Sequence, residues 1–184
     1  MNIFTVAPKA SQLYGYDIDS PSYQRLADFY KNILKMCLDR GEKIQAFNGG
    51  LLGADLAFAK VCADMRDAGA DIFCYMYIPY AGYNLFWDQK NRELSSSLVR
   101  RMDSIKYDNK EYTPLSIQQR NNWFISRSDV CLAIYGQGKN EVWRVMNESL
   151  RHKLKVIQFN FATGKVSRYR GIKTLTINGE TSGQ

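Results

Sequence analysis

Short apolar runs alternate along the chain with longer segments in which apolar residues recur every three or four positions. The short runs predict strands at residues 2–6, 43–47, 71–79, 104–108, 129–136 and 154–160. The longer segments predict helices at residues 20–41, 54–68, 84–102, 113–128 and 140–153. Strands that alternate with helices are typical of βαβ units. We therefore expect an α/β fold with a single doubly wound, mainly parallel sheet and helices on both faces.

Residues 1–162 contain all of these elements and are predicted to form one domain, which is an ordinary size for 184 residues with 45% hydrophobic composition. Residues 163–184 are interpreted as a basic C-terminal extension with one further edge strand at 173–178. The formal charge of +7 is unevenly distributed: from residue 138 onward, nine Lys and Arg face three Glu. This surplus indicates attraction to phosphate, on a small ligand or on nucleic acid, or else a solvated surface.

Several kinds of protein are disfavoured by the composition. No apolar run is long enough to cross a membrane, and the first residues lack a basic leader, so we expect a cytoplasmic protein without a membrane partner. The four cysteines lack Cys-x-x-Cys spacing and are expected to be free thiols. With His152 as the single histidine, neither a zinc cluster nor a histidine-based triad is expected, and no cofactor or metal is predicted.

The unusual residues of the chain follow the predicted strands. In an open parallel sheet the ligand lies beyond the carboxyl ends of the strands. Segments rich in glycine, proline and tyrosine occupy four such positions, at residues 7–17, 48–55, 79–84 and 135–141. The sequence therefore predicts one ligand-binding crevice at this edge of the sheet.

A glycine-rich loop at residues 48–55 leads into the second predicted helix. Gly49, Gly50 and Gly53 would allow backbone amides to approach an anion, and Asp55 would either cap the helix or accept a hydrogen bond from a ribose hydroxyl. The loop lacks the Lys-Ser/Thr of a Walker A motif and the spacing of Gly-x-Gly-x-x-Gly, and Asp71 begins its strand where a ribose-binding acid should end one. A tight turn before a well-capped helix is the alternative interpretation.

Charged and aromatic residues supply further candidates. Lys9 and Lys139, each after a predicted strand, could neutralise phosphate or could be ordinary surface lysines. Arg120 and Asn121, inside a predicted helix, could hold an anion or a base, or Arg120 could pair with an acid. Tyr80, Tyr83, Trp87 and Tyr135 could stack on a base, although Trp87 and Trp143 have the spacing of core residues.

Four motifs in order resemble the YpsA-like branch of the Smf/DprA–LOG (SLOG) superfamily of Rossmann-like nucleotide-binding proteins. They are APKASQLYGY at 7–16, NGGLLGAD at 48–55, PYAGYNLFW at 79–87 and QRNNWFISRSD at 119–129. The resemblance spans about residues 3–159 and implies a Rossmann-like fold with a nucleotide-type pocket. The candidate ligand-binding residues are Lys9, Asn48, Gly49, Gly50, Gly53, Asp55, Pro79, Tyr83, Arg120, Asn121, Gly136, Gly138, Lys139 and Asn140.

The chain departs from the family pattern at two loops. Ala7 and Lys9 replace a Gly-Arg pair, and Gly138-Lys139-Asn140 replaces Gly-Gly-Thr. In the LOG enzymes of the superfamily a catalytic Glu follows that Thr by three residues; here the position is Trp143, and Glu141 is out of register by two. The resemblance therefore implies the pocket and not the glycosidase, so no catalytic residue is assigned.

Three functions remain open. The first is non-catalytic binding of a nucleotide or nucleotide-derived signalling molecule, as a sensor or as a sequestering protein that could serve a virus against host defence. The second is a nucleotide-processing hydrolase of LOG type, with Glu141 or Asp55 as general base. The third is a DNA-binding module driven by the basic C-terminal third, for which we expect only weak, non-specific binding. Self-association is also expected, because the aromatic residues Phe29, Tyr30, Trp123, Phe124 and Trp143 exceed the needs of one small core.

Overall fold

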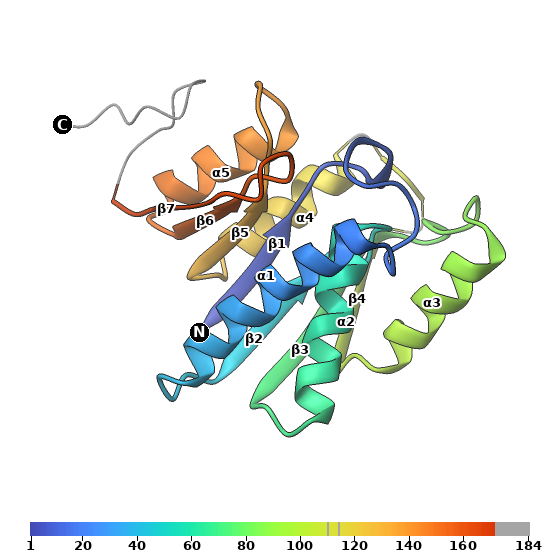
Figure 1. Ribbon diagram of the computed structural model, residues 1–184. Coiled ribbons are helices and arrows are strands. Elements are labelled where there is room, and N and C mark those ends of the chain that lie inside the picture. Colours follow the sequence, from blue (N-terminus) through green and yellow to red (C-terminus); the bar gives the residue numbers. More distant parts are fainter. Residues whose placement is uncertain (110, 114, 172–184) are drawn as a thin grey trace.

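The protein is described by a computed structural model that covers residues 1–109, 111–113 and 115–171. Seven strands form one sheet (Figure 1). The strands are β1 (Asn2–Val6), β2 (Ile44–Asn48), β3 (Ile72–Tyr80), β4 (Ser104–Asn109), β5 (Val130–Ile134), β6 (Lys155–Phe159) and β7 (Val166–Tyr169). The helices are η1 (Ala10–Gln12), α1 (Pro21–Leu38), α2 (Ala54–Asp67), α3 (Gln89–Arg100), α4 (Ser116–Ile125) and α5 (Glu141–Arg151).

The strand order is β4-β3-β2-β1-β5-β6-β7, and all neighbours are parallel except β6 and β7. The chain first builds outward from β1 to β4. It then returns to the other side of β1, where Ile3 pairs with Val130 of β5. The strand order therefore reverses between β1 and β5, and this is the position at which doubly wound folds bind ligands. The predicted fold class is confirmed.

Two hydrophobic cores lie on opposite faces of the sheet. Helices α1, α2 and α3 cover one face, with Tyr30 and Phe58 packed at a ring separation of 4.9 Å. Helices α4 and α5 cover the other, where Phe124 lies against Phe4. Figure 1 shows α1 and α2 in front of the sheet and α4 behind it. The alternation of side chains along each strand supplies apolar residues to both faces.

The element boundaries differ from the sequence prediction at two helices. Helix α3 begins at Gln89 rather than at residue 84, because the Asp88 side chain accepts a hydrogen bond from the Asn91 amide and caps the helix there. Helix α4 spans Ser116–Ile125 and is shorter than predicted. Strand β7 was not predicted, because its four residues carry only two apolar side chains, and the strand expected at 173–178 lies outside the described residues.

The aromatic residues that suggested self-association are mostly core residues. Phe29, Tyr30 and Phe124 are buried within the two cores, so the inferred excess of aromatic surface was wrong. Only Trp123 and Trp143 among the five remain partly exposed. Within the described part of the chain, no helix has the length and apolar character that a membrane span requires.

Candidate functional site

The glycine-rich loop at residues 48–53 joins β2 to α2 at the carboxyl edge of the sheet. Asn48 is buried and holds the loop from both sides: its Nδ2 donates to the Tyr75 carbonyl at 3.0 Å, and its Oδ1 accepts from the Gly50 amide at 3.2 Å. Gly50 has a φ of +67°, a left-handed conformation that favours glycine. The Gly50 amide is therefore used within the protein, whereas the sequence had suggested it for an anion.

A buried ion pair lies directly against this loop. Asp55 Oδ2 is 3.3 Å from Arg120 Nη1, and only 7% of Asp55 and 5% of Arg120 are exposed. The same carboxylate oxygen accepts from the Leu51 amide at 3.4 Å. A Cβ atom on Gly49 would lie 2.0 Å from Arg120 Nη1 and 2.4 Å from Asp55 Oδ2, so glycine is required for the pair to pack against the backbone. Of the two roles considered for Arg120, the structure shows pairing with an acid.

Burial governs the protonation of this pair. Loss of solvent raises the pKa of the Asp55 carboxyl, and the Arg120 guanidinium and the loop amides oppose that rise. Burial likewise lowers the pKa of Arg120. Asp55 lies in the first turn of α2, where the helix dipole favours a carboxylate, and burial opposes that effect. Arg120 therefore favours the ionised form of Asp55 against the effect of burial.

The hydrogen-bond network continues from α4 to α5. Arg120 donates through Nε and Nη2 to Asn121 Oδ1, at 3.3 and 3.0 Å, and Asn121 Nδ2 donates to Glu141 Oε1 at 3.1 Å. Glu141 also pairs with Arg144. The side chains thus link the β2–α2 loop, α4 and the first turn of α5. Glu141 was considered only as a general base of the hydrolase alternative and was absent from the ligand-binding set, because its position in the sequence shows only an acid in the first turn of a helix.

Several backbone amides at the start of α2 have no acceptor among the residues that the structure describes. The Leu56 and Ala57 amides donate to the carbonyls of Leu51 and Gly53. Across residues 1–109, 111–113 and 115–171, no acceptor is found for the amides of residues 53–55, which are themselves buried. Unsatisfied donors at a helix N-terminus attract an anion, and the helix dipole adds to that attraction.

The loop after β5 lies on the other side of the reversal point. Gly138 has a φ of +83°, and its carbonyl accepts from Tyr135 Oη at 2.6 Å. Asn140 caps α5 by accepting from the Trp143 amide at 3.0 Å, so its side chain is already engaged. A Cβ atom on Gly136 would approach the Phe161 ring to 3.0 Å. These contacts fix the loop in a tight conformation.

Lys9 and Lys139 follow β1 and β5, the two strands between which the order reverses. Neither lysine forms an ion pair with a residue that the structure describes; Lys139 Nζ lies 5.8 Å from the centre of the Trp143 ring. Two cations without a counter-charge in the described part of the chain therefore follow the strands at the reversal point.

Two predicted residues are used elsewhere. Pro79 is buried within β3, and Tyr83 hydrogen-bonds Ser95 of α3 at 2.7 Å and packs edge-on against Trp87. The structure therefore places Tyr83 and Trp87 with α3, not in the network around Arg120.

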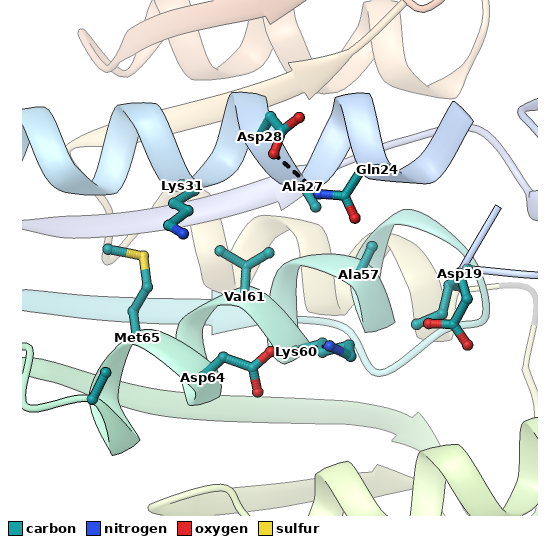
Figure 2. Close-up of a pocket in the computed structure, with 12 residues that line it drawn as sticks. Asp19, Gln24, Ala27, Asp28, Lys31, Ala57, Lys60, Val61, Asp64 and Met65 are labelled. Atoms are coloured by element: carbon teal, nitrogen blue, oxygen red, sulfur yellow. Dashed lines mark hydrogen bonds and ion pairs between the residues drawn. The ribbon is translucent and has the colours of Figure 1, made fainter. Parts of the chain in front are cut away.

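Two grooves lie between helices rather than over the glycine loop. One groove, of about 320 Å³, lies between α1 and α2 (Figure 2). Lys31 and Asp28 come from α1 and Val61 and Asp64 from α2, and no predicted site residue lines this groove. The other, of about 520 Å³, lies between α4 and α5 and includes Asn121 and Glu141.

The fold is that of a Rossmann-like α/β protein, with the glycine-rich loop at the carboxyl edge of its sheet. A family model described as the YspA SLOG family (YpsA) matches residues 8–163, and the chain belongs to this family.

Curated relatives are UPF0398 proteins of Bacillus and Staphylococcus species. One from Bacillus velezensis is 28% identical over 47% of this chain and 48% of its own length. One from Bacillus cereus is 25% identical over 60% of this chain and 61% of its own, and one from Staphylococcus haemolyticus is 23% identical over 73% of each. The first two matches span less than two thirds of the relatives.

A solved structure shares the fold. DNA processing protein A from Helicobacter pylori, described for its single-stranded DNA binding mode, superposes with a TM-score of 0.55. The match covers 86% of this chain and 64% of that one, at 14% sequence identity, and it supports the fold assignment.

Proposed function

We propose that the protein binds a nucleotide or a nucleotide-derived signalling molecule at the carboxyl edge of the sheet, as a sensor or a sequestering protein. One observation carries this proposal. Within the described residues, amides at the N-terminus of α2 lack an acceptor, and two lysines without an ion pair follow the strands where the sheet order reverses. That combination suits a phosphate group held by backbone donors and cations. Membership of the SLOG family supports a nucleotide-type ligand.

The proposal includes binding without turnover. Hydrolysis of an N-glycosidic bond requires a carboxylate within hydrogen-bond reach of the reacting atoms. Trp143, at the LOG position, has no acid–base capacity. The Glu141 carboxylate is engaged by Asn121 and Arg144, and the Asp55 carboxylate by Arg120. We therefore assign these acids to holding the loops in place.

Ligand identification tests the proposal directly. Protein purified from a cell extract is denatured, and the released small molecules are identified by mass spectrometry. The protein is also incubated with nucleoside monophosphates, ADP-ribose and cyclic nucleotides, and free base is followed by chromatography. Intact ligand supports the binder. Steady release of free base that disappears in a Glu141→Gln variant would show the LOG-type hydrolase instead.

Removal of the unpaired lysines is expected to weaken binding of a phosphate-bearing ligand. Lys9→Ala or Lys139→Ala should each cost about 1–3 kcal/mol, or about 5- to 150-fold in Kd, if the ammonium group pairs directly with phosphate. Isothermal titration calorimetry measures the change. Lys31→Ala is the matched control, since Lys31 lies in the groove between α1 and α2. If all three variants bound the ligand with the same affinity, neither Lys9 nor Lys139 would pair with its phosphate, and the proposed phosphate site at this edge would be contradicted.

Single-stranded DNA is the second candidate ligand, because the structural neighbour is described by its single-stranded DNA binding and this chain carries a formal charge of +7. We expect only weak binding, with a log–log salt slope of about −0.7 per phosphate contacted. Fluorescence anisotropy with a labelled oligonucleotide between low and physiological salt measures it. Tight binding that survives physiological salt would favour the DNA-binding function.

A further inference from the structure

A stripe of four charged residues runs along the outer face of α5. Glu141, Arg144, Glu148 and Arg151 are spaced by three, four and three residues, so they occupy roughly 80° of the helix circumference. Their side chains are 40%, 66%, 40% and 59% exposed, respectively. These four residues, here called the α5 stripe, also line the groove of about 520 Å³ between α4 and α5.

The charges of the α5 stripe alternate in sign along the helix. The spacing of its residues is the same from either end, and when the stripe is read backward, an Arg stands at the position of each Glu and a Glu at the position of each Arg. In a contact whose two-fold axis is perpendicular to the helix, the helix meets its own copy in antiparallel orientation, so the first position faces the last and the second faces the third. Glu141 would then face Arg151 of the other copy, and Arg144 would face Glu148. All four cross-pairs are attractive.

We propose that α5 and the groove beside it form a two-fold docking surface for a second copy of this chain. The groove supplies the packing component that charges alone lack. The partly exposed Trp143 lines it together with the stripe, and its indole can cover the aliphatic stem of an arginine while the guanidinium stays at the rim. Ile125 and Val145 also line the groove but are buried within the chain.

Within one chain the stripe residues form ion pairs along the helix. In a dimer these pairs within the helix could be replaced by ion pairs with the other copy. Glu141 pairs with Arg144, and Glu148 Oε2 lies 2.9 Å from Arg151 Nη1. Exposed pairs of this kind contribute little to stability, so exchange across a two-fold axis loses little. The contact would also adjoin the network through Asn121, because Glu141 belongs to both.

Charge reversal tests the proposed register. Arg144→Glu would place like charges opposite each other twice in each dimer, and Glu148→Arg would do the same with the opposite sign. Each single variant should weaken association by about tenfold or more. The combined variant R144E/E148R restores opposite charges at every position. It should associate as the wild type does but should not mix with wild-type chains.

Analytical ultracentrifugation between about 1 and 200 µM follows association from the chain mass of 21.2 kDa to twice that value. Circular dichroism checks that each variant is folded. Mixed dimers are detected by tagging one of the two chains. A wild-type chain that stays monomeric throughout, a dimer indifferent to either single reversal, or a combined variant that stays monomeric would each overturn the proposal.

Discussion

Gly49→Ala is expected to destabilise the protein by about 3–5 kcal/mol and to abolish ligand binding. The new Cβ would lie 2.0 Å from Arg120 Nη1 and 2.4 Å from Asp55 Oδ2, so the buried ion pair must separate or the loop must move. Separation of a buried pair leaves uncompensated charge in the core, which is the source of this large effect. Urea denaturation measures the stability, and calorimetry measures the binding.

Gly138→Ala is the matched control for this substitution. Gly138 has a φ of +83° and no heavy atom within 4 Å of an added Cβ, whereas Gly49 has no left-handed φ. The control should therefore cost only the conformational strain of about 1–2 kcal/mol. A Gly49→Ala variant no less stable than Gly138→Ala would contradict the tight packing of the loop on the ion pair.

Arg120→Met should lower the free energy of unfolding by about 3–5 kcal/mol at pH 7, because it leaves Asp55 buried without its counter-charge. Burial already raises the pKa of Asp55, and removal of Arg120 should raise it further. The pKa of Asp55 in the folded variant then lies above its unfolded value of about 3.9. As pH rises between these two values, Asp55 ionises in the unfolded chain first, and the free energy of unfolding falls. The loss in the variant should therefore be smaller near pH 4–5 than at pH 7.

A double variant distinguishes the effect of the unpaired Asp55 charge from the effect of the changed packing at residue 120. Asp55→Asn keeps an acceptor for the Leu51 amide while removing the negative charge. Combined with Arg120→Met, it should recover much of the lost stability and abolish the pH dependence of the difference. Urea denaturation of the wild type, the single variant and the double variant at pH 5 and pH 7 provides the measurement. A loss in Arg120→Met that is the same at both pH values would show that Asp55 is not the group responsible.

The alternation of strands and helices was readable because each element has its own hydrophobic period. The apolar run at 71–79, for example, became β3, which pairs with strands on both sides and lies between two cores. Strand β7 was missed because it lies at the edge of the sheet with alternately exposed side chains, which leaves little hydrophobic signal. The start of α3 was misplaced because Leu85 and Phe86 are apolar but exposed.

At the site, sequence reasoning found the loops more readily than the contacts. Glycines near a helix start indicate a close backbone approach, but only the packing of the helices shows that the Arg120 and Asp55 side chains lie against Gly49. The link from Asn121 to Glu141 joins residues 20 positions apart on different helices, and no local pattern reports it.

The position of β1 at the centre of the sheet has a consequence for how the chain folds. During synthesis, β2 emerges soon after β1 and can pair with it, but the partner on its other side is β5, whose first paired residue is Val130. Until more than a hundred further residues have left the ribosome, one edge of β1 has no neighbouring strand to pair with its backbone N–H and C=O groups. Such an open edge is prone to pair with other chains, and contacts of this sequence separation form slowly. Chaperone protection of the nascent chain would therefore matter most before β5 appears.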